Sequence, residues 1–400
     1  MRVVVLGGAG TVGSWTVRSL VVSDVFDEVI LADIDVEKMK KLVTELGGKV
    51  SYLKVDAEKP ETVKEALEHV DVVVNCVGPF YKYGPKILKT TIETGKNYVD
   101  ICDDYDATLK MFELDGEARE AGVSALIGMG SSPGASNLFV KFCSDYLLEE
   151  TESVDIYHAH GGEPYEGPGV IKHRIHSMLI DIPVFDNGKL RSVKFLEENG
   201  ESLIEEVEFP ELGKFKVYPY PHPETITLPR YIKGLKWVMN RGVVLPEEYM
   251  KLIIEIVKLG LISEEPIEVH GYKIAPIDFA VSYIIEKRKE LLRKTGLTEP
   301  VGAVKIVIRG VEKGKRVEYV VTATSKGGMM EGTGVPAAIG AILMASGKIE
   351  MKGVFPPEAA VNPMDAFVWV GKFRKKGKTI GVKVKKIDEE GNVKEIPLPI

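Results

Sequence analysis

The chain has 400 residues, of which 44% are hydrophobic and 28% charged, and its formal net charge is −7. This length exceeds what a single hydrophobic core usually serves, so we expect more than one domain. The negative charge disfavours nucleic acid and anionic membranes as partners, because neither attracts a net anion.

The cysteines and the apolar runs narrow the class of protein further. Cys76, Cys102 and Cys143 have no metal-binding spacing and leave one thiol over, so we expect neither a metal site nor a disulfide framework. The first strand begins at Arg2 with no signal peptide before it, and no apolar run reaches membrane-spanning length. The sequence therefore predicts a cytoplasmic protein without a membrane partner.

Strand and helix alternate regularly over residues 1–133, which is typical of βαβ units in a parallel sheet. The strands are continuous Val, Ile and Leu runs, as expected for strands covered by helices on both faces. The predicted strands are residues 2–7, 28–33, 50–55, 71–77, 97–102 and 123–128. Six strands in this rhythm predict an α/β fold, a Rossmann doubly wound parallel sheet.

A second domain is expected over residues 134–330, where strand-like alternation surrounds a helical stretch at 247–261. We predict an α+β domain with a mixed open sheet that binds substrate and forms a homodimer, since exposed sheet edges need cover. The apolar helix at 334–346 is predicted to return to the first domain, so that residues 331–370 complete it. Residues 371–400 are expected to form a C-terminal β-hairpin tail.

The turn after the first strand reads Gly-Gly-Ala-Gly-Thr-Val-Gly, a G-x-G-x-x-G pattern that opens a helix. Gly8 permits the tight turn, Gly10 the approach of a pyrophosphate, and Gly13 close helix–strand packing. Thr11 and Val12 begin the helix whose free N–H groups would bind the phosphates.

Asp33 ends the second strand, where an acidic residue holds the adenosine ribose hydroxyls. Its charge would repel a 2′-phosphate, so NAD is favoured over NADP. Further cofactor contacts are predicted from Asp56, which closes the third strand, and from Cys76, Gly78 and Pro79 at the end of the fourth. A turn or helix-start role for Asp56 stays open.

Several longer segments carry a family resemblance. They are GPFYKYG, KTTIETG, NYVDICDD, GMGSSPGASNL and MMEGTGVPAAIGAILMASGKIEMKGVFPPEAA. Over nearly its whole length the chain resembles the saccharopine dehydrogenase superfamily, and within it the segment order is most similar to lysine 6-dehydrogenases. The resemblance implies NAD-dependent oxidation of the terminal amine of a basic amino acid to the semialdehyde or cyclic imine.

One position departs from the saccharopine reductases, which carry an aspartate where this chain has Ser132 before Pro-Gly. A glutamate-forming saccharopine reductase is therefore disfavoured, and a smaller amine substrate fits better. Two alternatives stay open: a reductive condensation of the saccharopine or carboxynorspermidine type, and a superfamily member that binds the cofactor without catalysis.

The predicted catalytic residues of the first domain are Asp100 and Lys89. Asp100 lies in the fifth strand and Asp103 and Asp104 directly after it, and converging carboxylates raise one another's pKa, which suits acid–base work. Asp100 is the first choice, because Asp103 or Asp104 could instead cap the next helix. Lys89 matches an acid–base lysine through the resemblance, and an ordinary surface lysine is the alternative.

Other candidates lie where substrate would meet the second domain. Tyr81, after the fourth strand, could wall the nicotinamide or simply pack at the domain interface. Arg174 could clamp a substrate carboxylate, or form a surface salt bridge. His222 is the first choice among the histidines, with His176 assigned to substrate. The histidines concentrated in this domain have no convincing metal spacing: His158, His160, His173, His176 and His222.

Overall fold

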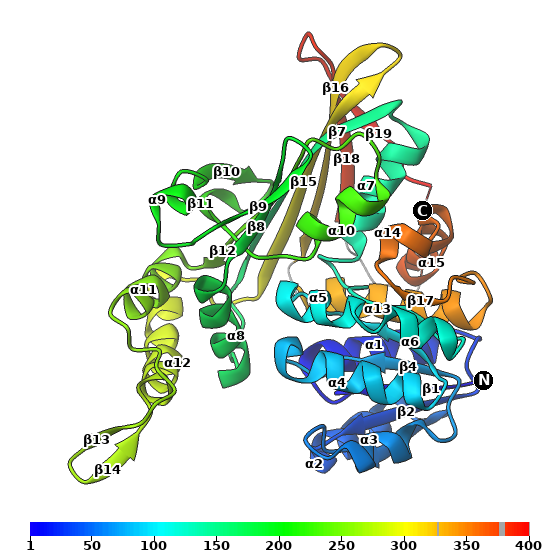
Figure 1. Cartoon of the computed structure of the whole chain (residues 1–400), viewed down its shortest axis with the longest axis vertical. Helices are drawn as coiled ribbons and strands as arrows, with labels where there is room; N and C mark the ends of the chain where they lie inside the picture. Colours follow the sequence, from blue (N-terminus) through cyan, green and yellow to red (C-terminus); the bar gives the residue numbers. More distant parts are fainter. Residues whose placement is uncertain (326–327, 376–380, 400) are drawn as a thin grey trace.

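The computed structural model describes residues 1–325, 328–375 and 381–399. Figure 1 shows two bodies, a parallel α/β layer structure and a long, strongly twisted sheet, joined near one edge of the first. The described helices are each too short or too polar to cross a membrane.

The first body is built from residues 1–146 and a late return of the chain. Its strands are β1 (Arg2–Leu6), β2 (Glu28–Asp33), β3 (Val50–Lys54), β4 (Val72–Asn75), β5 (Asn97–Asp100), β6 (Ser124–Leu126) and β17 (Gly353–Phe355). Its early helices are α1 (Thr11–Val22), α2 (Val36–Leu46), α3 (Pro60–Leu67), α4 (Phe80–Glu93), α5 (Tyr105–Phe112), α6 (Asp115–Glu120) and α7 (Ala135–Tyr146).

These strands form one sheet in the order β17-β6-β5-β4-β1-β2-β3, and every pair in it is parallel. The order reverses at β1, so the crevice between β1 and β4 is the switch point at which such folds bind ligands. The inner strands β1, β4 and β6 are almost fully buried, which explains why their sequences are mostly continuous aliphatic runs, whereas the edge strand β3 alternates between exposed and more buried residues.

The late helices are α13 (Met330–Ala345), α14 (Pro357–Ala360) and α15 (Pro363–Lys375). The α13 residues Val335, Ile339 and Ile342 share one core cluster with Val5 of β1 and Val17 of α1. The opposite face is covered by α3, α4 and α5, whose residues form a separate cluster with Val4 and Val73. Close packing of α13 on α1 requires a glycine, because a Cβ at Gly334 would lie 2.8 Å from the Val12 carbonyl oxygen.

The second body contains the elements between α7 and α13, together with the C-terminal strands. Its strands are β7 (Glu150–Gly161), β8 (Ile182–Asp186), β9 (Lys189–Val193), β10 (Glu205–Phe209), β11 (Gly213–Pro219), β12 (Trp237–Leu245), β13 (Ile267–Val269), β14 (Tyr272–Ile274), β15 (Val301–Glu312), β16 (Lys315–Ser325), β18 (Gly381–Ile387) and β19 (Val393–Ile396). Its helices are α8 (Pro168–Leu179), α9 (Glu198–Glu201), α10 (Glu224–Tyr231), α11 (Glu247–Lys258) and α12 (Pro276–Thr295).

The main sheet runs in the order β10-β11-β12-β7-β15-β16-β18-β19. It is mixed, because β12 and β7 are parallel while the neighbouring pairs are antiparallel. The expected class, a Rossmann sheet with a second α+β domain carrying a mixed sheet, is confirmed. The predicted C-terminal hairpin region contains β18 and β19, which extend this sheet, while residues 376–380 lie outside the described residues.

Helices α8, α11 and α12 pack on one end of the sheet and form a third core cluster with its strands. Figure 1 shows them beside the parallel layer structure, with α10 above α5. The loop after β5 therefore meets elements of the second body, and this junction holds the groups described next.

Candidate active site

The cofactor loop connects β1 to α1 through a very tight turn. Gly7 has φ +71°, and the N–H groups of Gly7 and Gly8 both donate to the Ala32 carbonyl oxygen at 2.8 and 3.2 Å. A Cβ at Gly13 would lie 2.2 Å from the Gly7 carbonyl oxygen, so only glycine allows the helix this close to the turn. The first N–H groups of α1, at Thr11 and Val12, have no partner within the helix and are available to bind an anion.

Asp33 lies beside this loop at the carboxyl end of β2. Its Oδ2 accepts a hydrogen bond from the Ala9 N–H at 3.0 Å, and its Oδ1 accepts from the Asp35 N–H at 3.1 Å. The following side chain, Ile34, is 60% exposed. Lys38 forms an ion pair with Asp35 at 3.0 Å. A free helix N-terminus, a glycine cradle and a neighbouring carboxylate fit an adenosine diphosphate group.

The other predicted cofactor contacts have mixed surroundings. The Asp56 side chain accepts from the Glu58 N–H at 3.0 Å, which is a turn arrangement. The Cys76 thiol lies 3.8 Å from the Thr16 hydroxyl, and burial raises the pKa of this thiol to about 12. Gly78 is exposed and a Cβ there would meet nothing within 4 Å, so Gly78 and Pro79 border open space where β4 ends.

Asp100 and Lys89 lie in opposite environments. Asp100 is fully buried at the end of β5, where its Oδ1 accepts hydrogen bonds from the N–H groups of Cys102 at 3.0 Å and Gly128 at 2.7 Å. Burial raises the pKa of Asp100 to about 6, although these two hydrogen bonds lower it. The Asp100 carboxylate thus ties two strand-end loops together. Lys89 is exposed on the outer face of α4, in the helix after β4.

Asp104 links the two bodies of the molecule. It is 3% exposed and immediately precedes α5, but its side chain makes no capping hydrogen bond to that helix. Instead Oδ2 accepts from the Tyr81 N–H at 2.9 Å, and Oδ1 lies 2.8 Å from Nδ1 of His173 on α8. The carboxylate therefore fixes the end of β4 and α8 at the same point.

His173 continues this contact to Tyr220, which follows β11. The His173 Nε2 atom lies 3.1 Å from the Tyr220 hydroxyl oxygen. Burial would lower the pKa of His173, but Tyr220, Asp103 and Asp104 raise it well above its ordinary value. An imidazolium therefore donates from Nδ1 to Asp104 and from Nε2 to Tyr220. Asp103, Asp104 and His173 could hold a metal ion by distance alone, but both ring nitrogens of His173 already have partners.

His222 forms a second acid–base pair close to the first. Its Nδ1 lies 2.6 Å from Oε2 of Glu224, the first residue of α10, and both side chains are buried. Burial would lower the pKa of His222, but the charge and hydrogen bond of Glu224 raise it. Burial would likewise raise the pKa of Glu224, yet His222 outweighs this effect and holds it at about 2. The pair is therefore an imidazolium–carboxylate pair.

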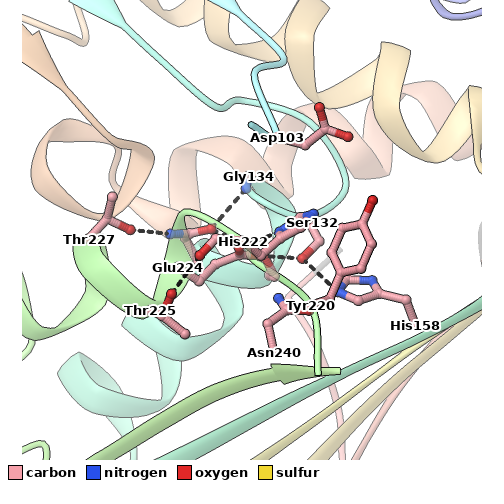
Figure 2. Close-up of polar contacts among 12 residues, drawn as sticks. Asp103, Ser132, Gly134, His158, Tyr220, His222, Glu224, Thr225, Thr227 and Asn240 are labelled. Atoms are coloured by element: carbon pink, nitrogen blue, oxygen red, sulfur yellow. Dashed lines mark hydrogen bonds and ion pairs between the residues drawn. The ribbon is translucent and has the colours of Figure 1, made fainter. Parts of the chain in front are cut away.

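Further polar groups hold this pair in place, as Figure 2 shows. Glu224 Oε1 accepts from the hydroxyls of Ser132 and of Ser136, the latter at 2.9 Å. The His222 ring centroid lies 5.2 Å from that of His158 and 5.6 Å from that of Tyr220. Burial lowers the pKa of His158 to about 3, so His158 is neutral and its Nε2, 2.8 Å from Asn240 Oδ1, carries the proton. One neutral and one charged imidazole thus stand side by side.

The predicted substrate residues lie around the junction. The rings of Tyr81 and His176 stack with centroids 4.3 Å apart, and His176 Nε2 lies 3.3 Å from Asp106 Oδ2. Arg174 is 4% exposed, and its guanidinium group binds Glu166 at 2.7 Å and the Tyr249 hydroxyl at 3.2 Å. Arg174 is therefore already paired with a carboxylate of its own chain.

Of the residues that the sequence pointed to, the structure brings together Tyr81, His176 and His222 at one junction. Asp100 lies beneath it, Arg174 is paired nearby, and Lys89 is exposed on the outside of α4. Glu224, Tyr220 and the pairing of Asp104 with His173 were not predicted from the sequence. A carboxylate two residues after His222 was a readable signal for the first, whereas the separation of 47 positions between His173 and Tyr220 left none for the second.

Comparison with known families matches both parts of the chain. Residues 3–126 match the saccharopine dehydrogenase NADP binding domain, and residues 171–378 match the saccharopine dehydrogenase C-terminal domain. The matched ranges contain the glycine loop, Asp33 and Asp104 in the first case and His173, Tyr220 and His222 in the second.

Two curated relatives align along most of the chain. Carboxyaminopropylagmatine dehydrogenase of Synechocystis sp. is 23% identical over 378 residues, which covers 90% of this chain and 92% of the relative. Carboxynorspermidine synthase of Vibrio alginolyticus is 23% identical over 394 residues, with coverage of 88% and 90%.

Solved structures share the fold. Saccharopine dehydrogenase (L-Glu forming) of Saccharomyces cerevisiae superposes with a TM-score of 0.69 at 16% identity, covering 96% of this chain and 99% of that one. Homospermidine synthase of Legionella pneumophila in complex with NAD has a TM-score of 0.59 at 12% identity, with coverage of 95% and 90%. Because the family's cofactor domain and C-terminal domain are both matched here, this NAD(P)-binding oxidoreductase belongs to the saccharopine dehydrogenase family.

Proposed function

We propose that the chain is an NAD-preferring dehydrogenase that joins a primary amine to a carbonyl compound by reductive condensation and so forms a secondary amine. The two relatives that align along about nine-tenths of their length are named for carboxylated polyamine products. This was the alternative to lysine 6-dehydrogenase chemistry in the sequence analysis, and the relatives favour it.

The observation that carries the proposal is the pair of acid–base groups at the domain junction. Condensation needs a neutral amine to attack the carbonyl, and then needs the carbonyl oxygen to leave as water. His222 with Glu224 and His173 with Asp104 supply two separate imidazoles near the carboxyl ends of β4 and β5. The nicotinamide supplies the hydride when it is bound, and Rossmann folds place it at this edge of the sheet.

The charges around the junction support a cationic substrate. Asp103 is 43% exposed in its side chain and Asp106 28%, and both follow β5. Glu264 lies near enough to Tyr81 for its charge to contribute to raising the pKa of that phenol. Carboxylates at the entrance attract a diamine and orient its distant ammonium group.

A second candidate is oxidation of the terminal amine of a basic amino acid, as in lysine 6-dehydrogenases. The imidazole and carboxylate of His222 and Glu224 favour it, because hydride removal from an amine carbon also requires a group that accepts a proton. The same residues would then work in the opposite direction.

A substrate panel distinguishes the two reactions. The purified protein is incubated with NADH or NADPH, one amine (propane-1,3-diamine, putrescine, agmatine or lysine) and one carbonyl compound (an amino-acid semialdehyde or a 2-oxo acid). We expect nicotinamide oxidation that needs both partners, and a secondary amine of the summed mass less one oxygen. Oxidation of lysine or a diamine by NAD in the absence of a carbonyl compound, with no condensation in any pair, would refute the proposal.

A homodimer is also proposed. The hairpin of β13 and β14 projects beside the start of α12 (Figure 1). Its Ile267 and Tyr272 side chains are 56% and 73% exposed, and Phe279 at the start of α12 is 58% exposed. Exposed apolar side chains on a projecting arm favour burial against a second copy. Light scattering of the purified protein tests this, since a mass of one chain at micromolar concentration would exclude it.

A further inference from the structure

The proposed function leaves open which group handles the oxygen atom of the carbonyl compound, and the surroundings of Tyr220 single out its hydroxyl. His173 donates its two N–H groups to Asp104 and to the Tyr220 oxygen. The Ser177 hydroxyl lies 3.2 Å from the same oxygen and donates to the His173 carbonyl oxygen at 2.9 Å. The Tyr220 oxygen therefore accepts a hydrogen bond from a cation, while its own proton is left with the 3.2 Å contact to the Ser177 oxygen.

The Tyr220 hydroxyl also points toward the side of the junction where a substrate would bind. Tyr220 is partly buried, and its ring lies beside His222 (Figure 2), with the hydroxyl directed toward the side on which Asp103 lies. Asp103 and Asp104 come from the loop after β5, so this side faces the carboxyl edge of the parallel sheet. A substrate at the nicotinamide would thus lie within reach of a phenol whose proton is engaged at most by the 3.2 Å contact to Ser177.

Resting on the proposed function, we infer that the Tyr220 hydroxyl is a catalytic residue that protonates the departing oxygen of the carbinolamine, with His173 and Asp104 as its positioning residues. In this step the C–O bond breaks and its electron pair stays on oxygen, which takes the Tyr220 proton and leaves as water. The nitrogen lone pair forms the C=N bond of an iminium ion. The phenolate recovers a proton from His173 Nε2, and solvent reprotonates His173.

The arrangement divides the proton transfers between two sites. His222, in the neutral form that appears above its raised pKa, accepts the proton of the attacking amine, and Tyr220 with His173 delivers one to the oxygen. Because each step is reversible, the same hydroxyl acts on water addition when the enzyme runs toward amine oxidation. The inference is therefore testable in whichever direction the native protein is active.

The first test replaces Tyr220 with Phe, and Tyr218→Phe is the matched control. Tyr218 lies two residues earlier, where its ring packs against that of Phe195. In the oxidative direction, hydride transfer precedes water addition. We therefore expect Tyr220→Phe to reduce one equivalent of NAD at a near-native rate and then to turn over at least a hundredfold more slowly. NAD affinity should stay within twofold of native, and Tyr218→Phe should behave as native.

Two outcomes would overturn the inference: a steady-state rate within threefold of native, or an equal loss of the first turnover and the steady state. A native protein that oxidises amines but never condenses them would refute the proposed function alone, because the burst test still applies. If Tyr220→Phe fails to fold, Asp104→Asn decides instead. Asn keeps an acceptor for the Tyr81 N–H but removes the charge that raises the pKa of His173.

The pH profile is the readout for Asp104→Asn. His173 has to be protonated in the condensation direction, so activity falls as the pH rises through its pKa. Asp103, His222 and Tyr220 also face this imidazole and remain unchanged in the variant. We expect the alkaline limb of kcat/KM for condensation to move to lower pH, and an unmoved limb would contradict the role of His173.

Discussion

The cofactor loop and the acid–base cluster lie at the same edge of the parallel sheet, but they draw on very different parts of the sequence. The loop is complete within Gly7–Gly13 and the end of the adjacent strand at Asp33, and its key contacts are backbone contacts. The cluster combines the loop after β5 with α8, the segment after β11 and α10. A local motif can be read from spacing, whereas a cluster built from distant segments depends on the whole tertiary structure.

The largest effect is expected from a substitution in the cofactor loop. Gly13→Ala places a Cβ 2.2 Å from the Gly7 carbonyl oxygen and 2.8 Å from the Gly8 Cα, both backbone atoms. We expect a loss of about 3 kcal/mol in the free energy of unfolding, the upper end for overpacking, together with loss of NAD binding. Urea denaturation and calorimetric titration measure the two effects.

Gly10→Ala is the control that separates packing from ligand contact. A Cβ at Gly10 has only the Gly7 carbonyl oxygen nearby, at 3.1 Å. Its stability should therefore stay near native while NAD affinity falls. Equal stability of the Gly13→Ala and native proteins would show that the loop tolerates a side chain and that its local character was overstated.

The second prediction tests the acid–base cluster. His222→Ala should lower kcat by about a hundredfold, which corresponds to about 2.7 kcal/mol, with NAD affinity nearly unchanged.

Glu224→Gln should act differently, because it keeps the shape of the side chain but removes the charge that raises the pKa of His222. In amine oxidation the neutral imidazole is the base, so activity appears as the pH rises through this pKa. The acidic limb should therefore move to lower pH in Glu224→Gln.

Near-native turnover of His222→Ala would remove this histidine from the mechanism and leave Tyr220 as the group to examine. The acid–base cluster would then be a structural polar core, and its difference from the cofactor loop would have no bearing on catalysis.

A third prediction concerns Asp33 and the choice between NAD and NADP. The native protein should bind NAD at least tenfold tighter than NADP, a difference of about 1.4 kcal/mol, since the Asp33 carboxylate repels a 2′-phosphate. Asp33→Ser combined with Ile34→Arg should narrow or reverse this ratio, because Ile34 is exposed and adjacent. Equal dissociation constants of the native protein for the two cofactors would contradict the assignment.

The smallest effect is expected at Lys89. Its side chain is exposed on α4, and Lys89→Gln should change kcat and KM less than twofold. Steady-state kinetics with the condensation substrates provide the measurement. A large loss would mean that α4 presents this face to the substrate in a state that differs from the structure, and would restore the lysine to the catalytic set.

Features set by neighbouring residues could be predicted from the sequence, whereas features assembled from distant segments could not. Aliphatic runs, turn glycines and the spacing of Asp33 are short-range signals, so six strands of the parallel sheet and the cofactor loop could be expected, but the seventh strand, β17, was not predicted. His222 was reached through a family resemblance, but its partner Glu224 was not, although it lies two residues away. Asp104 was assigned a capping role as an alternative, because its partner His173 lies in the other domain and no periodicity links the two.

The path of the chain through α13 has a consequence for synthesis on the ribosome. Strands β1 to β6 emerge first, yet one face of their sheet lacks the cover of Val335, Ile339 and Ile342 until β7 to β16 of the second body have been translated. The N-terminal domain is thus the first to be started, but it is completed only after most of the second body has been made. Nascent chains halted before residue 330 should carry a bare aliphatic face, and chaperones that recognise such surfaces should hold them until translation resumes.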